Sequence, residues 1–513
     1  MLVLFPLLGI ASALSVPYPD SAQIPFAGHA HNPADLPHPD PTHSFWTHSP
    51  GANPLAAEGS TGALTDDADV CIIGSGITGV SAAYHLANAV EKGTFPDSGS
   101  KIRAVILEAR EFCSGATGRN GGNLTPYEFN SFRKTEERFG REAALRYYAL
   151  EHYSATEMVR IARQAGWADA VDLVEGGHMD IVLTESALAD AKADYASAIA
   201  AGKNVNVSWL NSEEMNATFG TYNSGVRSPG YNLWPLKFAT QLFNRSLHIA
   251  PQQLDLRLHT RTPVTAISPL PLTDDSSTSP SGRRWLLATP RGPVRCSAVL
   301  HATNGYASHL LPHLAGPAGI IPVRGQVFAL RAAAPLSALT TASWGGDEGY
   351  WFPRPLAKNE TTPLVILGGK RTAAGPPFET DVTDDGVVDS RVGAALRGLL
   401  PKLFPGLFAP GREPEAEWTG IMGYTALEIP FVRCIHVGPV LDSRPSQSME
   451  GDLLRSNYKG QFIAAGYTGH GMPRAYGCAE VVVQMIADER AGRTWVTPAW
   501  FPRPFLTWVR DAR

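Results

Sequence analysis

The stretch DVCIIGSGITGVSAAYHLANAV, residues 69–90, decides the fold of this chain. A short run of β-branched and apolar residues precedes Gly74, Gly76 and Gly79, and Ala and Leu then recur at helical spacing. In such a unit Gly74 permits the tight turn, Gly76 lets backbone approach a diphosphate, and Gly79 lets helix and strand pack closely. Because a helix N-terminus also favours an anion, the stretch predicts a dinucleotide site.

An acidic residue at the end of the next expected strand supports this prediction. The strand RAVILEA, residues 103–109, carries Glu108, whose carboxylate can accept hydrogen bonds from ribose hydroxyls. The polar insertion EKGTFPDSGSK, residues 91–101, separates helix and strand and accounts for the long interval between the glycines and Glu108. The alternative is a glycine turn with a purely structural role.

A stretch with unusually bare backbone follows the acidic residue. Residues 111–123 read EFCSGATGRNGGN, with small residues on either side of one cation, Arg119. Small side chains would let N–H groups face a cofactor, and Arg119 would offset phosphate charge or orient a ring edge. The glycine turn by itself is compatible with NAD, whereas the combination favours FAD.

Five motifs occur in a fixed order: GSGITG, the acidic strand end, SGATGRNGG, HATNGY and GYTGHGM. Together they resemble the D-amino-acid oxidase, glycine oxidase and sarcosine oxidase superfamily, most closely its γ-glutamylputrescine oxidase-like branch and fungal relatives. The likeness covers roughly residues 36–490, including the lead-in LPHPDPTHSFW. It implies a Rossmann-like, glutathione-reductase-type α/β domain for FAD, with an inserted α+β substrate domain built on a mixed or antiparallel sheet.

The resemblance implies non-covalent FAD in an extended pose. The glycine turn would cradle the diphosphate, Glu108 would bind the adenosine ribose, Val264 would meet the adenine, and GYTGHGM would close over the isoalloxazine. No His follows Glu108 within residues 109–123, so a histidyl link to FAD is not expected there. The residues assigned to this groove are Gly74, Ser75, Gly76, Ile77, Thr78, Gly79, Glu108, Ala116, Thr117, Arg119, Asn120, Gly121, Val264, Thr303, Asn304, Gly466, Thr468, Gly469, His470, Gly471 and Met472.

The family's chemistry is hydride transfer from an amine-bearing carbon to flavin, imine hydrolysis, and reoxidation by O2 to give H2O2. Lys370 looks similar to the lysine that promotes O2 reduction in monomeric sarcosine oxidase; the alternative is a surface ion pair. Tyr350 and Arg354 lie on the expected substrate sheet. An aromatic residue there, such as Trp351, is as often part of the hydrophobic core of the sheet as part of an aromatic cage around a substrate. With His470 of GYTGHGM, the candidate catalytic residues are Lys370, Tyr350, Arg354 and His470.

Leu427 departs from the family pattern, which commonly has Asp at this position, although Glu428 follows it. The departure leaves a carboxylate role there, and the usual substrate, in question. Three alternatives to an amine or amino-acid oxidase therefore stay open: a dehydrogenase with another acceptor, a tailoring oxidase of a secondary-metabolite pathway, and a flavin-binding protein without turnover.

The chain divides into segments with different residue patterns. Runs such as GHMDIVLT, PVRGQVFAL, EGYWFPRP and PLVILGG predict strands of a mixed or antiparallel sheet, and LTDDSSTSPSGRR predicts a loop or hairpin insertion. The expected divisions are a signal peptide at 1–15, an irregular Pro- and His-rich arm at 16–67, an FAD-binding domain at 68–174, 229–312 and 416–500, and a substrate domain at 175–228 and 313–415.

Metal sites and disulfides are not expected. The arm contains several histidines that could suggest a metal site, but without Cys partners or regular ligand spacing the pattern favours a surface arm. The five cysteines show no CxxC spacing, so structural thiols are expected. The histidines of the arm are His29, His31, His38, His43 and His48.

Composition and the N-terminal sequence indicate which partners and which cellular compartment to expect. The 513 residues carry a net charge of −5 with no basic block, which argues against nucleic acid. MLVLFPLLGIASAL, residues 1–14, is too short to span a bilayer and predicts a signal peptide and a secreted protein; an uncleaved apolar N-terminus is the alternative. No oligomeric state is indicated. A glycan at Asn123 would be excluded by a neighbouring cofactor, and the N-x-S/T sequons are Asn123, Asn206, Asn216, Asn244 and Asn359.

Overall fold

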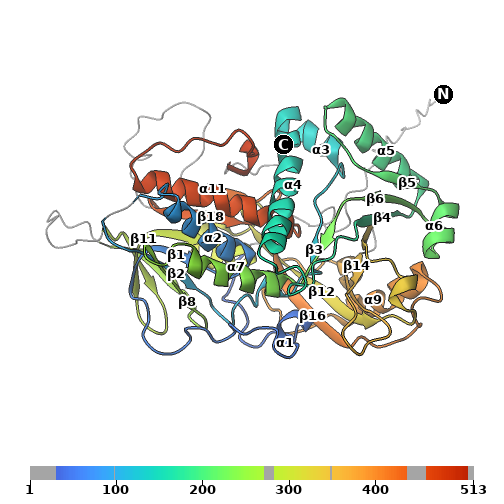
Figure 1. The fold of residues 1–513 in the computed structure, drawn as a ribbon, viewed down its shortest axis with the longest axis horizontal. Coiled ribbons are helices and arrows are strands. Elements are labelled where there is room, and N and C mark those ends of the chain that lie inside the picture. Colours follow the sequence, from blue (N-terminus) through green and yellow to red (C-terminus); the bar gives the residue numbers. More distant parts are fainter. Residues whose placement is uncertain (1–30, 97–98, 271–281, 347–348, 436–457, 507–513) are drawn as a thin grey trace, which may run out of the picture.

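The computed structural model describes residues 31–96, 99–270, 282–346, 349–435 and 458–506. The expected signal peptide and His29 lie outside these ranges, as does most of the expected insertion LTDDSSTSPSGRR. Figure 1 shows two sheets placed toward opposite ends of the long axis, with helices packed against each. The fold therefore has the two parts that the sequence predicts.

The first sheet is the parallel sheet of a dinucleotide-binding fold. Its central strand β1 (Asp67–Ile73) lies between β2 and β11 and is parallel to both. The strand order β8-β2-β1-β11-β18 is parallel throughout, and β17 closes one edge antiparallel. This order confirms the expected Rossmann-like arrangement. The remaining strands are β2 (Ile102–Leu107), β8 (Leu254–His259), β11 (Val294–His301), β17 (Phe431–Cys434) and β18 (Gln461–Ala465).

An antiparallel pair is added to β11. β9 (Ala266–Pro269) pairs with β10 (Trp285–Ala288), and β10 pairs with β11. In the sequence, the expected insertion LTDDSSTSPSGRR falls between these two antiparallel strands.

Helices cover the first sheet and bury its apolar face. In Figure 1, α11, α2 and α7 lie beside one another over the strands, and α2 contacts both neighbours. The small residues Ala82 and Ala83 of α2 are fully buried, which allows this close packing. These helices are α2 (Ile77–Glu91), α4 (Arg141–Gln164), α7 (Pro235–Ile249) and α11 (Met472–Arg490), of which α4 also contacts α11.

The second sheet is mixed, in the order β16-β12-β15-β14-β13-β4-β6-β5. Its pairs are antiparallel except β13 with β4, which are parallel. The four strands predicted for this sheet are present as β4, β12, β14 and β15. The bounds are β4 (His178–Val182), β5 (Ser208–Leu210), β6 (Ser224–Ser228), β12 (Ile321–Arg331), β13 (Ser343–Gly346), β14 (Tyr350–Pro353), β15 (Leu364–Gly368) and β16 (Ala416–Tyr424).

The strand β16 corrects one expected boundary. Residues 416–424 were assigned with the FAD-binding segments, but they pair along β12 from Ala416 opposite Ala329 to Tyr424 opposite Ile321. Trp418 on this strand is fully buried. The cross-strand partners lie about a hundred residues earlier in the chain, so local sequence does not reveal which sheet β16 joins.

The other elements connect the sheets or cap them. A short antiparallel pair joins β3 to β7, and α5, α6 and α9 lie around the second sheet (Figure 1). Their bounds are α1 (Phe45–His48), β3 (Asn123–Leu124), α3 (Phe132–Phe139), α5 (Glu185–Ala200), α6 (Ser212–Phe219), β7 (Tyr231–Asn232), α8 (Ala307–Leu310) and α9 (Ser390–Leu403), with 3-10 turns η1 (Ala116–Gly118), η2 (Asn304–Tyr306), η3 (Pro312–Leu314), η4 (Leu336–Ala338), η5 (Arg371–Ala374) and η6 (Arg503–Leu506).

The N-terminal arm is irregular, but part of it is core. Trp46 is fully buried, and its Nε1 donates a hydrogen bond to the Asn120 carbonyl at 2.6 Å. The Trp46 carbonyl in turn accepts one from Trp234 Nε1 at 3.0 Å. Among the described residues, no group of three or more His, Cys, Asp or Glu could hold a metal ion. The arm thus anchors the stretch around Asn120 instead of lying only on the surface.

A disulfide joins Cys71 on β1 to Cys296 on β11, contrary to the expectation of free thiols. The two cysteines are 225 residues apart in sequence, and their Cα atoms lie 6.0 Å apart because β1 and β11 are adjacent strands. Sequence spacing does not show such a pair, since it depends on strand order. Cys113, Cys434 and Cys478 are free thiols.

A pair of helical glycines tests the packing of α2 on β1. A Cβ at Gly79 would collide with the Gly74 carbonyl oxygen, which is backbone and cannot move aside. We therefore expect Gly79→Ala to lower the free energy of unfolding by about 2 kcal/mol or more, measured by denaturant unfolding.

Gly398→Ala is the matched control. Gly398 lies exposed on α9, and a Cβ there would meet no described atom within 4 Å. This change should stabilise the protein by roughly 0.5–1 kcal/mol, because alanine loses less backbone entropy in a helix. Equal effects of the two substitutions would contradict the packing argument.

Candidate cofactor and active site

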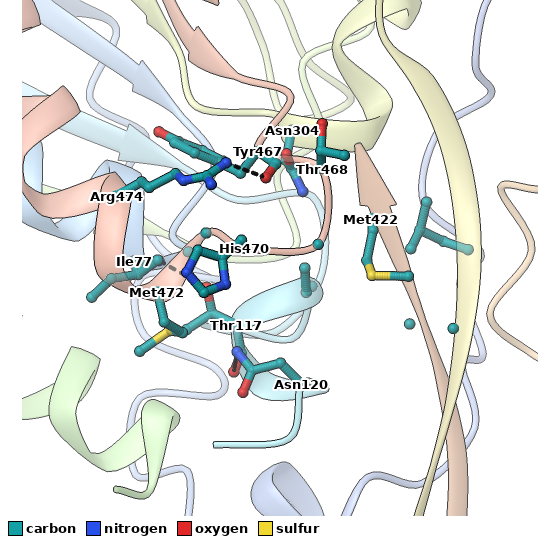
Figure 2. Close-up of a pocket in the computed structure, with 18 of the residues that line it drawn as sticks. Ile77, Thr117, Asn120, Asn304, Met422, Tyr467, Thr468, His470, Met472 and Arg474 are labelled. Atoms are coloured by element: carbon teal, nitrogen blue, oxygen red, sulfur yellow. Dashed lines mark hydrogen bonds between the residues drawn. The ribbon is translucent and has the colours of Figure 1, made fainter. Parts of the chain in front are cut away.

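One cavity of about 380 Å³ lies where the two sheets meet. Its wall includes the N-terminal ends of α2 and α11, the bare stretch 115–121, and residues of β4, β12, β14 and β16. Figure 2 shows side chains from α2, the bare stretch, β16 and the segment around the start of α11 gathered around it. Of the residues expected to bind the cofactor, all line this cavity except Ser75, Gly79 and Gly466.

The glycine turn presents backbone to the cavity. Gly74 has φ +105°, and a Cβ there would lie 2.7 Å from the Ala302 carbonyl oxygen, so the turn requires glycine. Gly76 is the N-cap of α2 and lines the cavity. The N-terminus of α2 therefore faces the cavity with its N–H groups and its positive dipole end.

Glu108 is held as a fixed acceptor at the end of β2. Its Oε2 accepts hydrogen bonds from the N–H of Ser75 at 2.9 Å and from Ser75 Oγ at 2.7 Å. Its Oε1 accepts one from the N–H of Arg110 at 3.0 Å. Ser75 thus positions Glu108 from outside the cavity wall, while Glu108 lines it.

The bare stretch is tied to α2 through Thr117, whose Oγ1 accepts a hydrogen bond from the N–H of Ile77 at 2.9 Å. Arg119 is 2% exposed and joins this stretch to the second sheet. Its Nε donates to the Ser114 carbonyl at 2.8 Å, and its Nη1 donates to the Thr419 carbonyl at 2.8 Å. Among the described residues, no hydrogen-bond partner reaches its Nη2. One nitrogen of the guanidinium is therefore buried without a hydrogen-bond partner among the described residues.

The charge of Arg119 is moderated by its surroundings. Burial lowers the pKa of Arg119 to about 10, and the Asp385 carboxylate, 3.4 Å from Nε, opposes this. Asp385 also forms a two-pronged ion pair with Arg110 at 2.8 and 3.0 Å. Two guanidinium groups thus share the Asp385 carboxylate, and the Glu108 carboxylate also acts on Arg110.

The loop before α11 closes another side of the cavity. Thr468 and Gly469 have φ of +51° and +75°, which turns the backbone sharply before the helix begins at Met472. The N–H of Gly466 donates to Asn304 Oδ1 at 3.1 Å, so Gly466 holds the loop from behind the wall. Figure 2 shows Thr468, His470 and Met472 arranged around the open space opposite Met422.

A buried charge network stands behind His470, and the sequence did not predict it. Glu151 on α4 is fully buried. Its Oε1 accepts a hydrogen bond from Arg474 Nε at 2.8 Å, and its Oε2 lies 3.1 Å from His470 Nε2. The N–H of Tyr127 also donates to Oε2, at 2.8 Å, and the Tyr127 ring stacks on the His470 ring with centroids 3.9 Å apart.

Burial and charge set the ionisation of this network. Burial by itself would raise the pKa of Glu151, but His470 and Arg474 outweigh it and lower that pKa to about 2. Burial lowers the pKa of His470 below its usual value, although Glu151 opposes the shift. At neutral pH the network therefore consists of an ionised Glu151, a charged Arg474 and a neutral His470.

A polar cluster on the second sheet faces the same cavity. His178 Nδ1 lies 2.7 Å from Ser343 Oγ, and His178 Nε2 lies 3.2 Å from Asp180 Oδ1. Asn130 Nδ2 donates to Asp180 Oδ2 at 3.2 Å. Tyr350 lines the cavity nearby, close to Gly121, where a Cβ would collide with its ring.

The structure brings together two of the four candidate catalytic residues. Tyr350 and His470 line the cavity, whereas Lys370 and Arg354 are not among the described residues that do so. Arg354 lies over the rings of Phe45 and Trp234, at 4.6 Å from each centroid, and pairs with Asp172 at 2.6 Å. This site is structural, since cation–π contacts and an ion pair engage the guanidinium.

Lys370 is half-buried at the end of β15, and the residues on either side of it, Gly369 and Arg371, reach the cavity in its place. Burial and the nearby Lys402 lower the pKa of Lys370. Trp351 is buried in the hydrophobic core of the second sheet, where it stacks on Trp344.

The position that commonly carries Asp in the family has an apolar role in this chain. Leu427 is buried among other apolar side chains. Glu428 lines the cavity and forms an ion pair with Lys134 at 2.8 Å. The carboxylate in this part of the wall thus belongs to Glu428 and is paired with Lys134.

Two residues of the cavity wall lie beside sequence motifs. Tyr127 follows the bare stretch and Arg474 follows GYTGHGM, so both lie beside motifs already singled out. Glu151, His178 and Asp180 carry no comparable signal, because they come from an ordinary helix and an ordinary strand.

The fold and this cavity define a dinucleotide-dependent enzyme, and comparison with known proteins gives its family. The family model for FAD dependent oxidoreductases, DAO, matches residues 69–485. The chain belongs to the DAO family of FAD-dependent oxidoreductases.

Individual relatives are distant. The chain is 24% identical over 403 residues to the probable oxidoreductase OrdL of Rhizobium meliloti (strain 1021), covering 77% of this chain and 82% of that protein. It is 37% identical to the γ-glutamylputrescine oxidoreductase of Escherichia coli (strain K12), over 76 residues and 15% of each chain.

Solved structures share the fold. Glycine oxidase from Geobacillus kaustophilus matches with a TM-score of 0.59 and 18% identity, over 88% of this chain and 100% of that chain. L-amino acid deaminase from Proteus myxofaciens matches with a TM-score of 0.61 and 15% identity, over 93% and 98%. These likenesses establish a common architecture.

FAD is the cofactor of this family, and the cavity suits it. The bare backbone of the glycine turn and the two helix N-termini suit an anionic diphosphate. The fixed carboxylate of Glu108 suits a ribose. Within the described ranges, no helix is long and apolar enough to cross a membrane.

Substitution at the glycine turn tests where FAD binds. A Cβ at Gly76 would lie 3.2 Å from Thr117 Oγ1, so the methyl groups of valine would fill the space between α2 and the bare stretch. We expect Gly76→Val to raise the dissociation constant of FAD at least about tenfold, measured by titrating apoprotein with FAD. Gly398→Ala serves as the control, and unchanged affinity in Gly76→Val would place FAD elsewhere.

Proposed function

We propose that this chain is an oxidase that oxidises the C–N bond of a small amine or amino acid, with O2 as electron acceptor and H2O2 as product. The observation that carries the proposal is one continuous cavity. One part, the cofactor cradle, is formed by the glycine turn, Glu108 and the bare stretch. The other part is a chamber whose wall includes Tyr127, His178, Tyr350 and His470. A cofactor held by the cradle would therefore meet a substrate held in the chamber.

We assign the cradle residues to FAD, bound without a covalent link. The N-termini of α2 and α11 and the Arg119 guanidinium would offset negative charge, and Glu108 would accept hydrogen bonds from ribose hydroxyls. When bound, FAD supplies the acceptor for a hydride and its electron pair. The protein's own contribution is to orient the substrate carbon and to exclude water.

The chamber is suited to a small polar amine. The Tyr127, Tyr147 and Tyr350 side chains provide aromatic surface, and His178, Asp180 and His470 provide hydrogen-bonding groups. An amine must lose its extra proton before a hydride leaves the adjacent carbon, because the nitrogen lone pair supports that departure. A neutral imidazole in the wall, His470, is placed to help with this proton.

The relatives support the reaction class without fixing the substrate. Glycine oxidase and L-amino acid deaminase, whose names state amino-acid substrates, share the fold. Lys370 is left out of the proposed machinery, since the cavity wall passes through its neighbours. The assignment of O2 as acceptor rests on the resemblance to oxidases.

The proposed reaction is tested on purified holoprotein by anaerobic mixing with amines, polyamines, and D- and L-amino acids. We expect at least one of these compounds to bleach the absorbance band of the oxidised flavin at about 450 nm. Mixing the bleached protein with O2 in a stopped-flow instrument should restore the absorbance and release H2O2.

Two outcomes would contradict the proposal in different ways. Absence of bleaching with every compound would favour a flavin-binding protein without turnover. Bleaching followed by very slow recovery in O2, with fast recovery on an artificial acceptor, would favour a dehydrogenase.

We also propose that the protein enters the secretory pathway. Support comes from the apolar N-terminal run and from the Cys71–Cys296 disulfide, since disulfides persist in oxidising compartments. The sequons at Asn206, Asn216 and Asn359 are exposed, which suits glycosylation.

Glycan mapping of protein secreted by a eukaryotic host checks this proposal. We expect glycans at one or more of Asn206, Asn216 and Asn359, and none at Asn123, which lines the cavity and is half-buried. Peptide mass spectrometry before and after removal of N-glycans reports each site. A fully occupied Asn123, or protein retained in the cytosol, would contradict the proposal.

A further inference from the structure

Glu151 is an unusual residue to find at the centre of a fold. It is fully buried on α4, and three groups converge on its carboxylate: Arg474 Nε at 2.8 Å, the N–H of Tyr127 at 2.8 Å, and His470 Nε2 at 3.1 Å. Removing a carboxylate from water is costly unless charge and hydrogen bonds compensate it. Arg474 supplies a full positive charge, so a neutral His470 can contact Glu151 as a hydrogen-bond donor.

The carboxylate dictates the protonation pattern of the imidazole. An ionised carboxylate can only accept hydrogen bonds, so His470 Nε2 must carry a hydrogen to approach it at 3.1 Å. Because His470 is neutral, its other ring nitrogen, Nδ1, then carries the lone pair. The stacked Tyr127 ring holds the plane of the imidazole, with 8° between the two rings.

The His470 side chain lines the cavity, and Figure 2 shows its ring pointing into the open space. We propose that Glu151 is a positioning residue that holds His470 as the Nε2–H tautomer, so that Nδ1 accepts a proton from the ammonium group of the substrate. This inference rests on the proposed function, because it assigns a proton acceptor to that reaction.

The step balances without another reactant. The N–H bond of the substrate ammonium breaks, a new N–H bond forms at His470 Nδ1, and the substrate amine keeps the electron pair. The resulting imidazolium is stabilised by the Glu151 carboxylate through Nε2–H. The neutral amine then has the lone pair that C–N oxidation requires.

Several other charged or titratable groups face Glu151 and His470 and influence the pKa of His470. Arg474 from α11 and His178 from β4 lower the pKa of His470. Tyr147 on α4 accepts a hydrogen bond from Arg474 Nη2, and Asp180 on β4 acts on the neighbouring Tyr127. Glu151 is the group whose charge favours protonation of His470, so its removal must lower the pKa of His470 further.

The first test needs no turnover. In ¹⁵N-histidine-labelled holoprotein at pH 7, long-range ¹H–¹⁵N spectra distinguish the two tautomers, and His470→Asn identifies the signal. We expect wild-type His470 to be protonated at Nε2 alone. A resting His470 protonated at Nδ1 alone, or at both nitrogens, would overturn the inference whatever the enzyme's activity.

The second test compares Glu151→Gln with Glu157→Gln. Glu157 lies on the same helix and pairs with Arg160 at the surface, so it is the matched control. With an amine that bleaches the flavin, Glu151→Gln should lower the rate constant for anaerobic bleaching at pH 7 about 100-fold or more. The acidic limb of its pH profile should also move down by about one unit or more, while Glu157→Gln leaves both unchanged.

A purely structural role for Glu151 would reduce the yield of folded protein without moving the acidic limb, and that result would overturn the proposal. Should Glu151→Gln fail to fold because Arg474 is left uncompensated, the double variant Glu151→Gln with Arg474→Gln removes both charges. Because Glu151 raises the pKa of His470 more than Arg474 lowers it, a smaller downward shift of the acidic limb is then expected. Failure of the proposed function would appear separately, as wild-type protein that shows the Nε2–H tautomer but is bleached by no amine.

Discussion

The cavity depends on the close contact between the first turn of α2 and the end of β1. That contact exists because Gly79 has no side chain and can rest against the Gly74 carbonyl. A Cβ at Gly79 would collide with the Gly74 carbonyl oxygen, so the helix could not pack this closely on the strand. The helix N-terminus is an anion site only in this position, so the rest of the cofactor cradle is built around one steric constraint.

The bare stretch after β2 does two things that a charged surface loop could not. Its small residues bring backbone to the cavity, and Arg119 fastens the stretch to the Thr419 carbonyl on β16. Because the guanidinium is buried and shares Asp385 with Arg110, it fixes the two sheets relative to each other across the cavity. The hydrogen bonds and ion pair of this arginine thus have a structural role at the edge of the cavity.

The buried carboxylate of Glu151 places a second constraint on the chemistry. A charge-neutral pair with Arg474 is stable in the interior, and it leaves His470 neutral beside the proposed substrate. Neither Glu151 nor the His178–Asp180 pair belongs to a glycine-rich motif, although each helps to define the chamber. The cradle and the chamber therefore differ in origin, the first built from backbone at turns and the second from side chains of regular elements.

This difference explains what the sequence could and could not predict. The amino-acid sequence by itself determined the β1–α2 unit, the acidic end of β2 at Glu108 and the FAD-type cradle, because turn geometry and exposed backbone are set by neighbouring residues. Tertiary structure decided which cysteines pair, that β16 joins the second sheet, and that Arg354 lies in an aromatic site away from the cavity. It also brought Glu151 to His470, 319 residues away. Such contacts depend on strand order and on how helices pack over a sheet, and local patterns of residues do not encode either one.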